Sequence, residues 1–283
     1  MPADTRSVAR AVGPRAAAPL RLPLASLLFA AVVGVILFFL ILPTLIVIPM
    51  SLGTARFIEF PPTGLTLRWY VEYINDPGWV SATFFSLRVA LATTVAATTV
   101  GTLAAIALVR GNLPGKGVIQ GLTLSPMVVP HIVIAVALYL VFAPLRLTGS
   151  FYGFLIAHTM LAVPYVVLTV TAALQRFDVT LELAALNCGA SRTQAFFSVV
   201  LPNILPGVAA GAVFAFLASF DEATVAFFIS GIEGKTITRK MFEDIDFNLT
   251  PVIAAVSTVL VAASLLLMAG VQLLQARRPG KAA

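Results

Sequence analysis

Charged residues are scarce in this sequence, and their scarcity excludes an ordinary soluble protein. Asp, Glu, Lys and Arg make up 11% of the 283 residues, whereas hydrophobic residues make up 59%. Soluble domains carry roughly a quarter charged residues. The composition therefore predicts an integral membrane protein. Its net charge of +6 has to be interpreted through the topology of the loops, and we expect no nucleic-acid partner.

Cysteine and histidine are also rare. The single cysteine, Cys188, excludes an internal disulfide and a CxxC metal site. The histidines His131 and His158 lie on different apolar runs from each other and from Asp221, whereas a metal site needs three or four convergent ligands. Ser150, in TGSFYG, lacks the G-x-S-x-G spacing of a serine hydrolase. We therefore expect neither a metal site nor an enzyme.

A phosphate-binding loop is missing as well. The segment GIEGKT at 231–236 resembles part of one, but the motif requires a glycine where this chain has Ile229. We expect no ATPase site and no cofactor in the chain itself.

Long apolar runs are abundant, and six of them are long enough to cross a bilayer as helices, which takes about 20 residues each. We therefore predict an all-α protein with six transmembrane helices. The runs are Leu24–Met50, Phe84–Val109, Val118–Ala143, Tyr152–Leu174, Leu205–Ile229 and Pro251–Leu274.

The positions of Lys and Arg predict the orientation of these helices. With the N-terminus inside, 11 of the 18 Lys and Arg residues lie on inner segments, six lie on outer segments, and Arg88 lies in the second run. Positive residues favour the cytoplasmic side, so both ends are predicted to be cytoplasmic. We expect a flexible basic tail over 1–23, a transmembrane domain over 24–276 and a short cytoplasmic tail over 277–283.

The outer segment after the first run is rich in aromatic residues. Trp69 and Trp79, the two tryptophans of the chain, lie there with Tyr70 and Tyr73. Such residues gather at the membrane–water interface. We expect an aromatic belt and a short helix along the membrane surface, and an aromatic cage for a cation is the alternative.

The inner segment 176–204 has the pattern of two short helices joined by a tight turn. Thr180 is placed to cap the first helix, with Glu182 in its first turn. Gly189 suits a residue of positive φ after the helix end. Ser191 and Gln194 form a capping-box pattern for the second helix. A hairpin of this kind could dock into a groove of a partner, or the segment could simply fold back on the membrane. Pro202 and Pro206 are expected to separate it from the fifth run.

The stretch LELAALNCGASRTQAFFSVVLP resembles the cytoplasmic coupling motif of ABC-importer permeases. Val199 takes the isoleucine position of that motif, and Leu183 stands where the family has glutamate, with Glu182 one residue earlier. On a helix, this shift is a rotation of about 100°. The resemblance implies a role in ATPase coupling for Glu182, Leu183, Ala184, Ala185, Gly189, Ala190, Ser191 and Pro202.

Residues 56 to 275 are similar to the second permease subunit of spermidine/putrescine-type importers. The similarity rests on LSPMVVPHIV, AHTMLAVPYVVLTVTAAL, SFDEATVAFFISG and TPVIAAVST. It implies a bacterial inner-membrane location, a second permease subunit, a cytoplasmic ATPase dimer that binds ATP and Mg²⁺, and a periplasmic substrate-binding protein. The expected substrate is a small polyamine-like or amino-acid-like solute, with γ-aminobutyrate and opines left open.

Four ionisable residues within the apolar runs are candidates for the translocation pathway: Asp221, Glu222, His131 and His158. Such residues usually face the interior of a helix bundle or a water-filled path. Adjacent residues of a helix point in different directions, so we expect only one of the two acids to face the pathway. The alternatives are acids at the outer membrane surface and histidines that hydrogen-bond between helices. An ion-coupled carrier could use the same groups, but it would usually show internal repeats.

A stripe of small residues in the fifth run predicts close helix packing. Gly207, Gly211, Ala215 and Ser219 recur every four residues, a spacing that lets two transmembrane helices approach closely.

Overall fold

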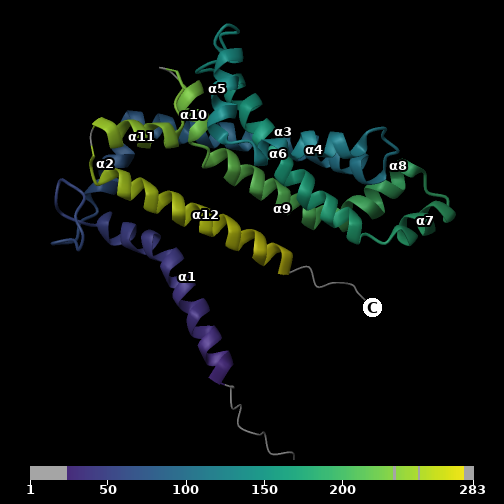
Figure 1. Ribbon diagram of the computed structural model, residues 1–283, viewed down its shortest axis with the longest axis horizontal. Helices are drawn as coiled ribbons and strands as arrows, with labels where there is room; N and C mark the ends of the chain where they lie inside the picture. The colour runs from purple at the N-terminus through teal and green to yellow at the C-terminus, as the bar shows by residue number, and fades with distance from the viewer. Residues whose placement is uncertain (1–23, 232–233, 248, 277–283) are drawn as a thin grey trace, which may run out of the picture. The chain divides into compact units, whose positions relative to one another are not determined.

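The computed structural model describes residues 24–231, 234–247 and 249–276, and all regular elements among them are helices (Figure 1). The predicted all-α class is thus confirmed over these residues. The two expected tails, 1–23 and 277–283, lie outside them. The chain divides into two compact units, Met1–Leu45 and Ile46–Ala283.

The first unit contains most of α1 (Leu24–Met50), a helix whose apolar side chains are largely exposed. The second unit contains the rest of the described chain. Its longest helices are α3 (Pro77–Arg110), α6 (Phe151–Arg176), α9 (Leu201–Phe220) and α12 (Val252–Ala276). Five helical segments in the described residues are long and apolar enough to cross a membrane, or six if one bent pair counts as a single span.

Helices α3, α6 and α9 pack closely through small residues. A Cβ atom added at Gly101 of α3 would lie 2.7 Å from Cβ of Val166 on α6. One added at Gly207 of α9 would lie 2.5 Å from Cβ of Ala173, and one at Gly211 would lie 2.6 Å from Oγ1 of Thr169. The small-residue stripe therefore packs α9 against α6, as predicted.

The third apolar run is not one helix. It forms α4 (Lys116–Val128) and α5 (His131–Phe142), which meet at an angle of 101°. Proline lacks the N–H that a continuous helix needs, and it restrains the preceding residue to extended conformations. Pro130 accordingly follows Val129, whose ψ is 131°. The prolines of this run predict a kink, and the observed bend at Pro130 is sharp enough to divide the run into two helices.

The fifth run also differs from the prediction. Helix α9 ends at Phe220, and α10 (Thr224–Ile229) begins after a short break. At the other end, α8 (Arg192–Ala195), the π-helical turn η1 (Phe196–Val200) and α9 form one helical stretch, Arg192–Phe220. Pro202 follows the π-helical turn η1 closely, and the helical stretch continues through it. The prolines therefore do not separate the hairpin from the span.

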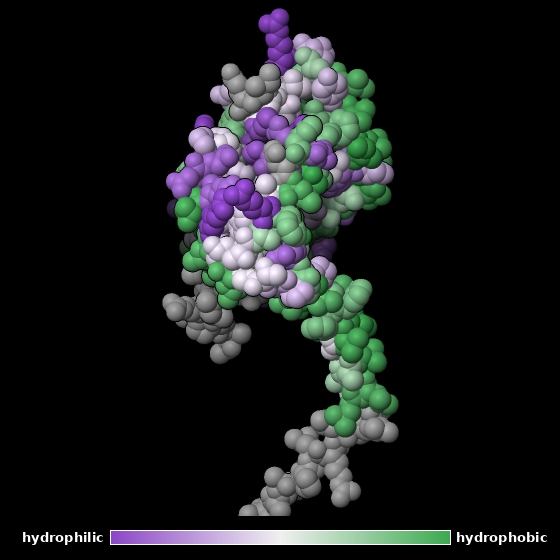
Figure 2. All heavy atoms as spheres, turned by 90° about the vertical axis from the view of Figure 1, so that its left-hand side faces the viewer, coloured by the Kyte–Doolittle hydropathy of each residue, from purple (hydrophilic) through white to green (hydrophobic). Residues whose placement is uncertain are grey.

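Helices α2 (Arg68–Asn75) and α11 (Ile237–Phe247) lie at one end of the second unit, and α7 (Val179–Asn187) and α8 lie at the other (Figure 1). Figure 2 looks onto the end with α2 and α11, where hydrophilic side chains gather beside apolar ones. The expected short helix is present as α2. The aromatic-belt prediction is wrong for Trp69 and Trp79, because both are buried inside the protein with Ile237 and Val256.

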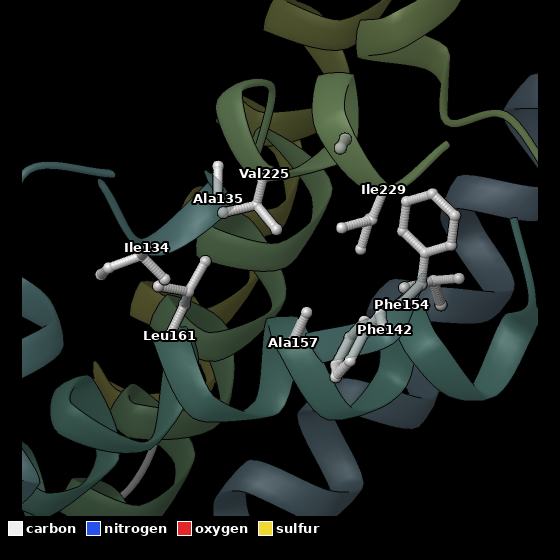
Figure 3. Packing of buried hydrophobic residues seen from close by; sticks show 10 residues of the cluster. Ile134, Ala135, Phe142, Phe154, Ala157, Leu161, Val225 and Ile229 are labelled. Atoms are coloured by element: carbon white, nitrogen blue, oxygen red, sulfur yellow. The ribbon is translucent and has the colours of Figure 1, made fainter. Parts of the chain in front are cut away.

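An apolar cluster holds α10 between α5 and α6 (Figure 3). Val225 of α10 lies near Ala135 of α5 in this view, Ile229 of α10 lies on the side of Phe154 of α6, and Ala157 of α6 belongs to the same cluster. These contacts fix the positions of the two helix breaks, which precede α5 and α10.

Candidate functional site

The first helix of the hairpin, α7, is capped by Asp178. Its carboxylate accepts hydrogen bonds from the backbone N–H of Thr180 at 2.9 Å and from the hydroxyl of Thr180. These hydrogen bonds lower the pKa of Asp178. The prediction that Thr180 is the cap is therefore wrong by two residues: Thr180 is a donor to the cap.

The turn of the hairpin has the geometry that its sequence predicts. Gly189 has a φ of +90°, and the N–H of Ala190 donates to the carbonyl of Ala185 at 3.1 Å. Ser191 Oγ accepts from the N–H of Gln194 at 3.2 Å, while Gln194 Oε1 accepts from the N–H of Ser191 at 2.8 Å. The capping box is thus confirmed, and it starts the second helix.

Glu182 does not point outward from the hairpin. Its Oε2 lies 2.7 Å from Nη1 of Arg110 at the end of α3, and the two side chains are only 22% and 28% exposed. The guanidinium of Arg110 also lies over the ring of Phe177, 5.4 Å from its centroid. Glu182 therefore binds a basic residue of its own chain, whereas the sequence suggested the helix dipole or a partner.

Apolar side chains dominate the exposed surface of α7. Leu183, at the position of the family glutamate, is 53% exposed. The remaining residues of the predicted coupling set are small or lie at helix starts. Ala184, Gly189, Ser191 and Pro202 are exposed, and Ala185 and Ala190 are half-buried.

The two helix breaks meet at an acidic residue. Glu222 is 7% exposed, and its Oε1 accepts a hydrogen bond from the N–H of Val225 in the first turn of α10. Its Oε2 lies 3.2 Å from Nδ1 of His131, the first residue of α5. The hydroxyl of Thr238 donates to the Glu222 carbonyl at 2.9 Å. One side chain thus joins the break before α5 to the break before α10.

A pocket of about 300 Å³ opens at these breaks. Both acids line it, although adjacent residues of a helix point in different directions, and Glu222 is the one that is buried and paired with His131. Both can line it because α9 ends at Phe220, and the helical rule for adjacent residues no longer applies. Asp221 is exposed. The pocket, called here the break pocket, is lined by Pro126, Met127, His131, Leu161, Tyr165, Ala218, Asp221, Glu222, Ala223 and Thr224.

His158 lies elsewhere. It is fully buried, and its Nδ1 is 2.9 Å from Oγ of Ser219. This contact joins α6 to α9 at the end of the small-residue stripe. Of the two possibilities that the sequence left open for this histidine, the hydrogen bond between helices is the one observed, and His158 does not line the break pocket.

Comparison with known proteins identifies the family. Residues 97–279 match the family described as "Binding-protein-dependent transport system inner membrane component". The chain belongs to this family. The permease is 32% identical to the spermidine/putrescine transport system permease protein PotC of Escherichia coli (strain K12), over 83% of this chain and 89% of that protein.

Two further comparisons agree with this membership. The permease is 30% identical to the putrescine transport system permease protein PotI of Escherichia coli (strain K12), over 80% of this chain and 82% of that protein. Its fold resembles a chain in the crystal structure of a bacterial alginate ABC transporter in complex with an alginate pentasaccharide-bound periplasmic protein. The TM-score is 0.65 at 16% identity, and the match covers 87% of this chain and 92% of that chain.

Arg110 and Tyr165 are among the residues of the candidate sites that sequence reasoning missed in this permease. In the sequence, Arg110 was counted only as a positive charge that indicates the orientation of the helices, although it forms an ion pair with Glu182. Tyr165 lines the break pocket from the middle of α6. The single signal for Arg110 was an arginine at the end of an apolar run. Its partner is distant in the chain, so no local pattern could identify the pair.

Proposed function

We propose that this permease is one of two membrane subunits of an ABC importer in a bacterial inner membrane. In this proposal both chain ends face the cytoplasm, as does the end with α7 and α8, and the end with α2 and α11 faces the periplasm. A cytoplasmic ATPase dimer binds ATP and Mg²⁺, and a periplasmic protein delivers the substrate. The excess of Lys and Arg on the inner segments supports this orientation, and family membership supports the assembly.

The α7–α8 hairpin is the proposed contact with the ATPase. Gly189 is exposed, and no atom lies within 4 Å of a Cβ placed there, so the tip of the hairpin is free to enter a groove. Because Glu182 is held by Arg110, the outward contact consists of Leu183 and Ala184. The second arm continues into α9 without interruption. A displacement of the hairpin is thereby passed along α9 toward the break pocket.

The break pocket is the proposed substrate site of the membrane subunit. Leu161 and Tyr165 lie ten and fourteen residues into the 26-residue helix α6. At 1.5 Å per residue, they are about 15 and about 21 Å from its start, near the middle of a hydrocarbon core about 30 Å thick. Transporter sites are commonly built at this depth from interrupted helices. The two carboxylates support an ammonium group as the ligand.

Polyamine-like solutes are the first candidates for the ligand of this pocket. Relatives of the permease are named for spermidine and putrescine, and Asp221 offers an exposed carboxylate. A zwitterion such as γ-aminobutyrate is the second candidate. The imidazole of His131, at 3.2 Å from Glu222, lines the pocket with Asp221, so it can donate a hydrogen bond to the carboxylate of such a solute while Asp221 receives its ammonium.

The assembled importer provides the test. The tagged permease is purified from its native membranes, and the complex is reconstituted in proteoliposomes with its periplasmic protein. We expect an ATPase and a second permease to co-purify, and radiolabelled putrescine or spermidine to accumulate only with internal ATP. Labelled γ-aminobutyrate distinguishes the second candidate. Accumulation driven by an ion gradient without ATP, or purification without any ATPase, would falsify the proposal.

A further inference from the structure

A second and larger pocket has no role in the function proposed above. Its volume is about 640 Å³, and it lies where α6, α7 and α9 meet. It is called here the hairpin pocket. It is lined by Thr169, Ala172, Ala173, Arg176, Phe177, Asp178, Leu181, Asn203, Pro206, Gly207 and Ala210.

The two pockets lie along the same face of α6. Leu161 and Tyr165 line the break pocket, and Thr169, Ala172 and Arg176 line the hairpin pocket. The successive spacings of these residues are four, four, three and four. Residues three or four apart lie on one side of an α-helix, so one continuous stripe of α6 lines both pockets.

Helix α9 shows the same pattern. Asn203, Gly207 and Ala210 line the hairpin pocket, and Ala218 lines the break pocket. Phe214 lies four residues from Ala210 and four from Ala218, and it is therefore on this stripe between the two pockets. Its side chain is 45% exposed, so it stands out from the helix surface at that point.

We propose that the two pockets are chambers of one route along α6 and α9, and that Phe214 is the gate between them. The inference rests on the proposed transport function and names the residue that controls passage. An apolar constriction can block a polar solute by excluding water. Gly207 and Gly211 bring α9 against α6, so the stripes of the two helices run side by side along this contact.

The charges of the two chambers differ in a way that suits release of a cation. The break pocket has Asp221 and Glu222 with His131. The hairpin pocket has Arg176 and Asp178, and the Asp178 carboxylate already accepts two hydrogen bonds from Thr180. A cation is attracted by the first set and meets Arg176 in the second. The route therefore runs from a chamber that holds a cation to one that does not.

The gate at Phe214 can be opened from the hairpin, because α9 is continuous with the hairpin's second arm. Phe214 lies on the same uninterrupted stretch, Arg192–Phe220, as the second arm of the hairpin. A rotation of this stretch that is driven by the ATPase turns Phe214 out of the route. The gate and the second arm of the hairpin are then parts of one helical stretch.

Single cysteines on either side of Phe214 test the gate. Cys188 is replaced by Ser, which leaves no other cysteine in this chain, and Ala210→Cys or Ala218→Cys is added. Both alanines are half-buried on α9. The importer in inside-out vesicles, without ATP, is treated with a charged thiol reagent that does not cross membranes. We expect Ala210→Cys to react faster than Ala218→Cys by about tenfold or more, equivalent to about 1.4 kcal/mol.

Changes at Phe214 complete the experiment. Phe214→Ala should raise the reaction rate of Ala218→Cys at least about tenfold, whereas Phe214→Trp should lower it. The control is Phe84→Ala, since Phe84 is 60% exposed and belongs to α3, outside the stripes of α6 and α9 that line the pockets. Equal rates at the two cysteines with Phe214 intact, or an Ala218→Cys rate that ignores both Phe214 variants, would overturn the gate. ATP-driven uptake by the Cys188→Ser importer is measured first, so that a failed gate is distinguished from a failed transport assignment.

Discussion

The hairpin and the break pocket are held together by different kinds of contact. Within the hairpin, most hydrogen bonds join residues two to five apart in the chain, as in Asp178 with Thr180 and Ser191 with Gln194. The Arg110–Glu182 pair is its contact with α3. The break pocket is instead lined by residues of five helices, α4, α5, α6, α9 and α10, and of the link between α9 and α10 that contains Glu222. A locally bonded hairpin keeps its shape while it moves, whereas the pocket changes when its helices shift.

The largest effect is expected at the tip of the hairpin. Gly189→Trp places a bulky side chain at a residue with a φ of +90° that faces open space. It strains the turn and obstructs docking into the ATPase, so ATP-driven uptake should fall at least about 100-fold, or about 2.7 kcal/mol. Uptake in proteoliposomes is the measurement.

The matched control for this prediction is Gly115→Trp. Gly115 also has a positive φ, +66°, and no atom lies within 4 Å of a Cβ added there, but it precedes α4. A loss as large as that of Gly189→Trp would show that strain in any turn is sufficient, and the coupling role of the hairpin would then be unsupported.

A smaller effect is expected in the break pocket. Asp221→Asn removes the charge of an exposed carboxylate without changing its size, and uptake of a cationic substrate should fall about tenfold, or about 1.4 kcal/mol. The reconstituted importer should keep its basal ATPase rate. Glu222→Gln should in addition weaken the contact with His131. Uptake that is unchanged in both variants would remove the acids from the pathway.

The contact between the hairpin and α3 should show a modest coupling energy. Arg110→Ala and Glu182→Ala each break the pair, and a double-mutant cycle on thermal unfolding should give about 0.5–1 kcal/mol for a partly exposed ion pair. The reversed pair, Arg110→Glu with Glu182→Arg, should recover part of the loss in uptake. Additive losses and no recovery would mean that the two residues act independently.

The smallest effect concerns the cap of α7. The pKa of Asp178 is lowered in the folded chain by its hydrogen bonds with Thr180. Its contribution to stability is therefore present above the unfolded pKa and is lost as pH falls through the folded pKa. Amide exchange at Thr180, corrected for its intrinsic pH dependence, should stay constant near neutral pH and rise below pH 3.8. Asp178→Asn should remove this rise at acidic pH, and a rise that persists in the variant would contradict the assignment.

Much of the hairpin could be predicted from sequence because its determinants are local. Gly189 and the pair Ser191 and Gln194 act over a few residues, and both predictions are confirmed. The cap was misplaced because Asp178 and Thr180 are both good capping residues, and the choice depends on where the chain leaves α6. The direction of Glu182 could not be predicted, since its partner Arg110 comes from another helix.

The break pocket could not be predicted because distant residues form it. Pro130 indicated a kink, yet the apolar run around it is long enough for a straight span. No proline or glycine marks the end of α9 at Phe220. The environment of the two tryptophans could not be predicted from sequence either. An aromatic side chain with an N–H suits a membrane interface and a protein core equally well, and Trp69 Nε1 donates to the Gly53 carbonyl at 2.7 Å inside the protein.

The proposed mechanism requires that a movement of the hairpin reaches the break pocket through α9. The most direct test is the reaction rate of Ala218→Cys in the Cys188→Ser importer, measured with and without ATP, with and without Gly189→Trp. We predict that ATP changes this rate when Gly189 is present and leaves it unchanged in the Gly189→Trp variant, because Ala218 lines the pocket at the end of the stretch Arg192–Phe220. The same response to ATP in both proteins would contradict transmission from the hairpin to the break pocket.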